Sequence, residues 1–306
     1  MRPNCLASGS RELSKDPDAR KKRKNIMPEL PEVETIRKQI SKQIENKKIA
    51  EIEVRYVKII KAPLKKFKGA VLGARIKNVR RRGKLIIIDL SSGFSLLIHL
   101  KMTGQLIFAG VVPPRNLRRY DPRHIRAEFL FAGGDRLIFN DIRKFGYINS
   151  MRTKDLPEYL DKKYGPEPLD KNFTLAKFKT ILAKKPRQKK IKQFLMDQKN
   201  IAGIGNIYAD EILFRAGVRP DKKTATLAYD EIKKIFQSIK KILNDAIKYR
   251  GSSISNYVDS QGRAGKYHLR LKAYGRAGQP CPKCKTPITK IILSGRGTHF
   301  CPNCQK

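Results

Sequence analysis

The chain has 306 residues, with 68 Lys and Arg against 27 Asp and Glu, which gives a formal net charge of +41. This length accommodates two domains with their own cores. The cations are spread over most of the chain and predict a polyanionic partner such as nucleic acid, although a basic surface that serves only solubility is the alternative. The longest apolar runs, such as residues 85–88, are strand-sized, and residues 1–26 lack the apolar stretch of a signal peptide. We therefore expect no membrane span and a cytoplasmic protein.

The first half of the chain is predicted to be an extension followed by a β-rich domain. Residues 1–26 are polar, charged and aperiodic, which predicts a disordered extension. From Pro31, apolar residues recur at helical spacing up to Ile44. Apolar and alternating runs separated by polar turns then predict strands near residues 52–56, 85–90, 94–100, 128–131 and 137–139. We expect a β-sandwich with flanking helices over residues 27–150.

The second half of the chain is predicted to be helical. A linker over residues 151–170 contains Gly165-Pro166-Glu167-Pro168. Apolar residues at helical spacing then predict helices near residues 175–182, 191–195 and 229–249. We expect a helical domain over residues 171–255 and a smaller unit over residues 256–306. The predicted fold class is α+β with several domains.

Four of the five cysteines fall into two CxxC pairs near the end of the chain, at Cys281, Cys284, Cys301 and Cys304. In a reducing compartment this spacing predicts one structural Zn²⁺ held by four thiolates. Two unrelated redox pairs are the alternative. We expect no role for Cys5, which stands alone in the extension.

The segment MPELPEVET at residues 27–35 carries the first functional signal. Taken by itself, it is a turn that leads into a helix whose acidic first turns complement the helix dipole. Further segments follow in order along the chain: RRGK at 81–84, IHLKMTGQL at 98–106, DIRKFG at 141–146, YGPEPL at 164–169, FLMDQKNIAGIGNIYADEILFRAG at 194–217, AYGRAGQPC at 273–281 and GRGTHFCPNCQK at 295–306. Together they closely resemble bacterial formamidopyrimidine-DNA glycosylase, the 8-oxoguanine DNA glycosylase and AP lyase, from residue 27 to residue 306.

The resemblance implies an N-terminal proline as the nucleophile, which here is Pro28. A terminal amine has a pKa much closer to neutrality than a lysine side chain, so more of it is unprotonated at cellular pH. The resemblance implies that Pro28 displaces an oxidised purine and forms a Schiff base, and that β- and δ-elimination follow. It assigns Glu29 as the acid/base, Glu32 as the residue that orients the amine, and Lys84 as a contact to the phosphate and the lesion.

The resemblance also implies contacts to damaged duplex DNA after base flipping. Met102, Arg143 and Phe145 match the residues that fill the space left by the flipped nucleotide. The chain has Asp-Ile-Arg-Lys-Phe at 141–145 where the family commonly has Asp-Pro-Arg-Arg-Phe, which retains both Arg143 and Phe145.

Further DNA contacts are implied for His99, Asn206 and Arg296, and Arg296 also assists δ-elimination. Asn206 belongs to the turn of a helix–two-turn–helix, Arg296 belongs to the zinc-finger hairpin, and residues 260–267 match a loop that covers the extruded base. We expect the protein to act as a monomer.

Pro28 can act only with a free nitrogen, because the nitrogen of a proline within a chain is a tertiary amide. Translation from Met27 and removal of that Met would free it, as would cleavage of the extension; a DNA-binding protein without catalysis is the third possibility. We favour translation from Met27. The sister family endonuclease eight, which excises oxidised pyrimidines, usually opens Pro-Glu-Gly-Pro-Glu, so Leu30 favours the purine enzyme.

Overall fold

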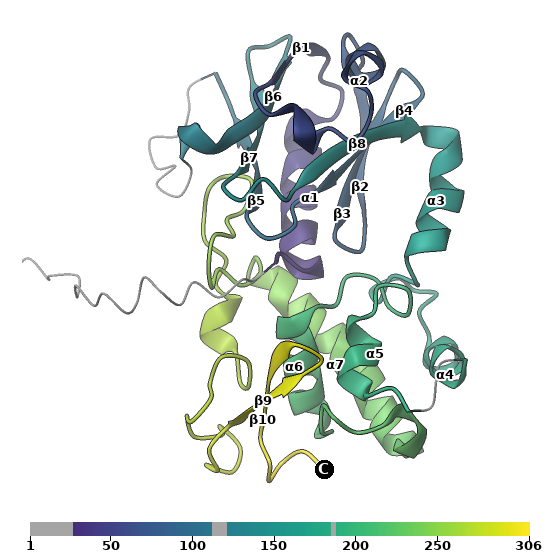
Figure 1. The fold of residues 1–306 in the computed structure, drawn as a ribbon, viewed down its shortest axis with the longest axis vertical. Helices are drawn as coiled ribbons and strands as arrows, with labels where there is room; N and C mark the ends of the chain where they lie inside the picture. Colours follow the sequence, from purple (N-terminus) through teal and green to yellow (C-terminus); the bar gives the residue numbers. More distant parts are fainter. Residues whose placement is uncertain (1–26, 112–120, 185–187) are drawn as a thin grey trace, which may run out of the picture.

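The computed structural model describes residues 27–111, 121–184 and 188–306 (Figure 1). The predictions for the extension at residues 1–26, including Cys5, lie outside these ranges. The described chain forms a β-rich N-terminal part and a helical C-terminal part, followed by a hairpin with two cysteines on either side of it. This α+β architecture confirms the predicted fold class.

The N-terminal part contains two antiparallel four-stranded sheets, with the strand orders β1-β6-β7-β5 and β2-β3-β4-β8. Their strands are β1 (Ile49–Val54), β2 (Ile76–Arg82), β3 (Leu85–Leu90), β4 (Phe94–His99), β5 (Gly104–Ala109), β6 (Ile125–Phe131), β7 (Arg136–Asp141) and β8 (Tyr147–Arg152). Ile86 and Ile88 of β3 face the shared core, whereas Leu85 and Ile87 pack against α3 (Leu156–Lys163). Burial of both faces explains why β3 is a continuous apolar run.

Helix α1 (Leu30–Ile44) joins the two parts of the molecule (Figure 1). Its apolar residues from Val33 onward are buried in the core of the two sheets. Leu30, at the first turn, belongs instead to the helical core of the C-terminal part. The orientation of the two cores is therefore fixed through one rigid helix.

The C-terminal part is built from α4 (Leu175–Ala183), α5 (Ile191–Met196), α6 (Asn206–Ala216) and α7 (Tyr229–Lys248). Helix α6 ends at Gly217, whose left-handed conformation (φ 73°) is the usual way to stop a helix. None of the helices in the described ranges is both long and apolar enough to cross a membrane.

The chain ends in a hairpin of β9 (Thr289–Leu293) and β10 (Arg296–Phe300), which packs against α6. Ser294 and Gly295 form its tight turn with φ values of 48° and 70°. The turn places Arg296 at the tip of the hairpin, while Cys301 follows directly at the other end of β10.

Several elements had no counterpart in the sequence prediction, namely β2, β5, β8, α2 (Leu64–Val71) and α3. In β2, only Ile76 and Val79 are buried, and the strand ends in three arginines. Such strands are formed by pairing with an apolar neighbour, and their own composition gives little signal.

Arg81 connects three segments that are distant in sequence. Its side chain is only 9% exposed and donates to Glu34 of α1 at 3.0 Å and to Glu167 of the linker at 2.7 Å. It also donates to the carbonyl oxygen of Gly83 at 2.8 Å. Burial raises the pKa of Glu34, but hydrogen bonds and charges from Arg37 and Arg81 lower it by more. The pKa of Glu34 is therefore below its ordinary value.

We expect Arg81→Met to lower the free energy of unfolding by about 3–5 kcal/mol, because Glu167 loses its guanidinium partner and Glu34 keeps only that of Arg37. This contribution is present at neutral pH and is lost as the pH falls through the lowered pKa of Glu34. Urea denaturation at neutral and acid pH measures both effects. Arg80→Met is the control, because Arg80 pairs with Asp89 while 41% exposed, and we expect it to cost about 1 kcal/mol or less. Equal losses for the two variants would contradict this account.

Candidate active site

A cavity of about 770 Å³ lies between the two parts of the molecule. Residues predicted from the sequence that line it are Glu29, Lys84, Met102, Phe145, Asn206 and Arg296. Lys101 and Lys144 line it as well, which gives four cations against a single carboxylate. The cavity therefore attracts an anionic ligand.

Glu29 stands where α1 meets the start of α6. Its carboxylate accepts hydrogen bonds from the backbone N–H groups of Gly205 at 2.7 Å, Ile207 at 2.9 Å and Tyr208 at 3.4 Å. These donors are the unpaired amides that every helix leaves at its N-terminus. Burial nevertheless raises the pKa of Glu29, against the lowering effects of Lys84 and these three hydrogen bonds. A carboxyl group with a raised pKa is suited to donate a proton.

Two glycines allow this close approach. A Cβ atom on Gly205 would lie 2.4 Å from Cδ of Glu29 and 2.7 Å from Nζ of Lys84. Gly203 has a φ of +91°, and a Cβ there would lie 2.7 Å from Leu30. The Gly-x-Gly pattern at 203–205 thus brings the amides of α6, the carboxylate of Glu29 and the ammonium of Lys84 to one place.

Lys84 occupies the turn between β2 and β3 and is buried. Burial lowers its pKa, and the positive charges of Arg296 and Lys101 lower it further, against the raising effect of Glu29 and Glu32. The lysine is therefore held next to Glu29 with a weakened preference for the charged form.

Glu32 is buried one helical turn behind Glu29. One carboxylate oxygen accepts from the backbone N–H of Glu29 at 2.9 Å, and the other accepts from Tyr208 Oη at 2.6 Å and Ser252 N at 2.7 Å. Burial, followed by the charge of Glu29, raises the pKa of Glu32 to about 7. These contacts fix the backbone immediately after Pro28, which is itself buried, while Met27 lines the cavity.

The loop after β7 carries two predicted DNA contacts. The carboxylate of Asp141 accepts from the backbone N–H groups of Arg143 at 3.2 Å and Gly146 at 2.7 Å, which fixes the loop. Phe145 is 52% exposed, and the guanidinium of Arg143 lies 4.7 Å from its ring. An exposed aromatic ring beside an exposed guanidinium offers flat surfaces on which a base can stack. Half-buried Met102 lines the cavity next to them.

His99 does not line the cavity. It is buried at the end of β4, stacks on Tyr147 with ring centroids 5.5 Å apart, and accepts from the backbone N–H of Lys101 at 3.0 Å. Burial and the charges of Lys101 and Lys84 lower its pKa to about 3, so the imidazole is neutral. A role in DNA contact stays a prediction.

An ion-pair cluster that the sequence reasoning missed fixes the hairpin to the helices. Asp210 of α6 pairs with Lys192 of α5 at 2.6 Å and accepts from His299 N at 2.9 Å. Lys192, which is 1% exposed, also donates to Thr298 at 2.8 Å, and Asn206 donates to the carbonyl of Gly297 at 3.0 Å. The sequence signal for this cluster was one charged residue within each apolar helical pattern, Lys192 and Asp210. The cluster holds Arg296, next to Gly297, at the rim of the cavity.

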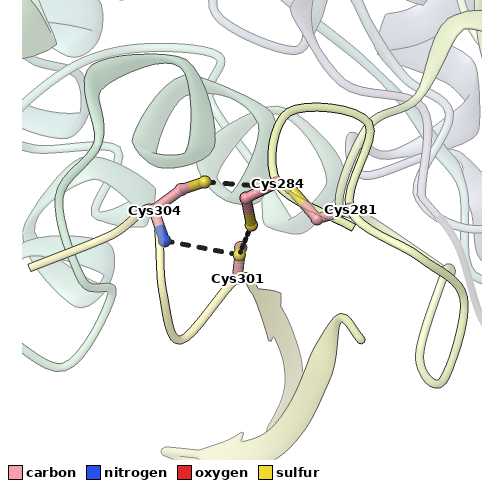
Figure 2. Close-up of side chains that lie close together, drawn as sticks. All are labelled: Cys281, Cys284, Cys301 and Cys304. Carbon is pink, nitrogen blue, oxygen red and sulfur yellow. Dashed lines mark hydrogen bonds between the residues drawn. The ribbon is translucent and has the colours of Figure 1, made fainter. Parts of the chain in front are cut away.

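The four cysteines converge from two loops, as Figure 2 shows. All four Sγ atoms lie within 4.8 Å of one another, with Cys284 and Cys301 3.4 Å apart and Cys281 and Cys304 4.0 Å apart. A tetrahedral zinc ion with Zn–S bonds of about 2.3 Å requires sulfur separations of about 3.8 Å. Backbone N–H groups of Lys283 and Cys304 each donate to a sulfur at 3.4 Å. This set of donors fits a metal ion.

Three family models match the chain, and together they cover most of it. The formamidopyrimidine-DNA glycosylase N-terminal domain matches residues 27–148, and the formamidopyrimidine-DNA glycosylase H2TH domain matches residues 164–258. The zinc finger found in FPG and IleRS matches residues 278–306. H2TH denotes the helix–two-turn–helix.

Similar proteins extend over almost the whole chain. The formamidopyrimidine-DNA glycosylase of Listeria monocytogenes is 43% identical over 282 residues, which is 92% of this chain and all of that protein. The Fpg of Lactococcus lactis in complex with DNA containing an abasic site has a TM-score of 0.81 at 40% identity, covering 91% of this chain and 99% of that one. The same protein with Fapy-dG-containing DNA has a TM-score of 0.81 at 39% identity, covering 91% and 100%.

We expect Gly205→Ala to lower DNA glycosylase activity by about 100-fold or more. The added Cβ must displace the Glu29 carboxylate or Lys84, and displacements of about 1 Å have costs of that order. The measurement is single-turnover excision, with circular dichroism to establish folding. Gly133→Ala is the matched control, because a Cβ there meets nothing within 4 Å. Full activity in Gly205→Ala would mean that the close approach is unnecessary.

We also expect removal of the metal by a chelator to weaken binding to duplex DNA by about tenfold or more, because the hairpin that carries Arg296 loses one of its two anchors. Fluorescence anisotropy with labelled duplex measures the change, and re-addition of Zn²⁺ is the control. Unchanged affinity of the metal-free protein would contradict a role for the cysteine cluster in DNA binding.

Proposed function

The chain belongs to the formamidopyrimidine-DNA glycosylase family, and from this premise we propose that it is a base-excision repair enzyme for oxidised purines. Its substrates are 8-oxoguanine and formamidopyrimidines in duplex DNA, and it works as a monomer. The observation that carries the proposal is the meeting of Glu29 and Lys84 at Gly205 in a cation-lined cavity. A binding protein without catalysis needs neither a buried carboxyl group nor a buried lysine at that point.

Pro28 is the nucleophile once its nitrogen is the amino terminus of the chain. The secondary amine attacks C1′ of the damaged nucleotide, the glycosidic bond breaks, and the base leaves with the bonding electrons and takes up a proton. Loss of the amine proton and opening of the sugar ring leave an iminium between Pro28 and C1′. Met27, the residue bonded to this nitrogen, lines the cavity, and Pro28 itself is buried.

Glu29 supplies the proton that opens the sugar ring. Burial raises the pKa of its carboxyl group and so favours the protonated form, and hydrogen bonds from the first amides of α6 hold it at the cavity. Glu32 holds the backbone of Glu29 and thereby orients the amine of Pro28. Lys84, beside Glu29, contacts the phosphate and the lesion.

The iminium then acts as an electron sink for strand cleavage. Loss of a proton from C2′ expels the 3′ phosphate, and loss of a further proton from C4′ expels the 5′ phosphate from C5′, which leaves a one-nucleotide gap. Arg296 lies at the cavity rim, where its guanidinium assists the second elimination by neutralising the departing phosphate.

The remaining predicted residues hold the distorted duplex. Phe145 and Met102 fill the space of the flipped nucleotide, and Arg143 contacts the base left unpaired. Asn206 contacts a phosphate, His99 contacts the DNA, and residues 260–267 cover the extruded base. The four cysteines hold one Zn²⁺, which is structural because four thiolates leave no position for water.

Borohydride trapping on an 8-oxoguanine:C duplex tests the nucleophile. We expect a covalent adduct from a chain begun at Met27 and trimmed to Pro28, and none from the chain begun at Met1, in which the nitrogen of Pro28 is an amide. Pro28→Gly in the trimmed chain should lose most excision activity. Equal trapping by both chains would assign the nucleophile to another amine.

The same trimmed chain, tested on duplexes with oxidised purines or oxidised pyrimidines, tests the substrate class. We expect cleavage of the purine lesions; cleavage confined to pyrimidines would overturn the assignment. The absence of trapping and cleavage on every duplex would favour a DNA-binding protein without catalysis.

A further inference from the structure

The chain returns from α7 to the N-terminal part before it enters the zinc hairpin. We call residues 252–267 the return segment; it includes residues 260–267, to which the lid role is assigned above. In Figure 1 it follows the green α7 and runs beside β5. Val258 is buried against apolar residues of β5, β6 and β7, and Phe108 N of β5 donates to Ser260 O at 2.9 Å. The lid is thus attached to a different part of the molecule from the helix that precedes it.

Helix α1 holds the return segment at two places. At its first turn, Glu32 accepts from the backbone N–H of Ser252 at 2.7 Å. Two turns later, the amide of Gln39 makes three hydrogen bonds with the segment. Its Nε2 donates to Asp259 Oδ2 at 2.9 Å, and its Oε1 accepts from Ser260 N and Ser260 Oγ, each at 3.0 Å.

Asp259 transmits this contact to the tip of the lid. Its carboxylate is completely buried and also accepts from Gln261 N at 3.0 Å and Arg263 N at 2.9 Å. Arg263 Nε pairs with the same carboxylate at 3.1 Å. The conformation of residues 259–263 is therefore organised around one carboxylate, and Gln39 is the residue outside the loop that holds that carboxylate.

We propose that Gln39 is a positioning residue for base excision, because it attaches the lid to α1, the helix that begins with Glu29 and Glu32. The inference rests on the proposed function of residues 260–267. Gln39 lies ten residues after Glu29, roughly 15 Å along a helix axis, which is too far for it to touch the reacting atoms. It acts through Asp259 and Ser260, and its effect is confined to the step that requires the extruded base.

The test compares Gln39→Met with Gln43→Met in the zinc-loaded chain that begins at Pro28. Methionine has nearly the same volume and helix propensity as glutamine but neither donates nor accepts the three hydrogen bonds. Gln43 lies one turn further along the same helix, and its Oε1 has no hydrogen-bond partner. Single-turnover rates are measured on an 8-oxoguanine:C duplex and on a duplex with a preformed abasic site, which has no base for a lid to cover.

We expect Gln39→Met to slow excision of 8-oxoguanine by about tenfold, a barrier change of about 1.4 kcal/mol, and to leave cleavage of the abasic site within about twofold. Gln43→Met should leave both rates unchanged. Equal loss on both substrates would show a general structural role and overturn the proposal, as would unchanged rates on both.

Hydrogen exchange of the free protein provides an independent readout. Gln39→Met should accelerate amide exchange at residues 259–263 relative to Gln43→Met, and unchanged exchange would overturn the anchoring role. If the wild-type chain acts on neither duplex, the proposed function fails, and the exchange experiment still decides whether Gln39 anchors the segment.

Discussion

The docking of the Glu29 carboxylate on the first amides of α6 is the contact on which the rest of the site depends. A helix that begins inside a protein needs acceptors for its first N–H groups, and here a side chain 176 residues earlier supplies them. The contact places the first turn of α1 against the helical core, where Leu30 is buried. It also requires backbone without side chains at Gly203 and Gly205, so the two domains meet at a point that admits little variation.

This arrangement places ionisable groups where burial is costly. Burial raises the pKa values of Glu29 and Glu32 and lowers that of Lys84. The pKa values of the two acids and of the lysine therefore lie closer together than in water. Apolar residues at these positions would give a more stable domain junction. Glu29 and Lys84 line one cavity and Glu32 lies buried directly behind Glu29, and such clusters of ionisable groups with shifted pKa values are typical of functional sites. The buried pair of Lys192 and Asp210 is different, because its partners lie in the hairpin and its effect is to position Arg296.

The sequence predicted those features whose signal is local. Three predictions came from local patterns: the apolar run of β3, the amphipathic α7 and the spacing of the cysteines. The structure contains the strand, the helix and the cysteine cluster. Strands such as β2 and β8 carry polar residues and are formed by pairing with β3 and β4, so their own residues gave little signal. The contact between Lys192 and Asp210 joins two successive helices, and the contact between Gln39 and Asp259 joins segments 220 residues apart. No local pattern identifies such partners, although a charged residue within an apolar pattern indicates that one exists.

Helix α1 connects the contacts made by Glu29, Glu32 and Gln39. Its first turn provides Glu29 and Glu32, its middle anchors the return segment through Gln39, and its buried face belongs to the core of the sheets. A rigid helix keeps its residues at fixed separations, so displacement of its first turn would also displace the attachment of the return segment. The opposite wall of the cavity is held separately, since the Lys192–Asp210 pair anchors the hairpin to α5 and α6 and the cysteine cluster packs against Phe214 of α6. The active site is therefore assembled where two independently anchored units meet, and the Glu29–α6 contact sets the distance between them.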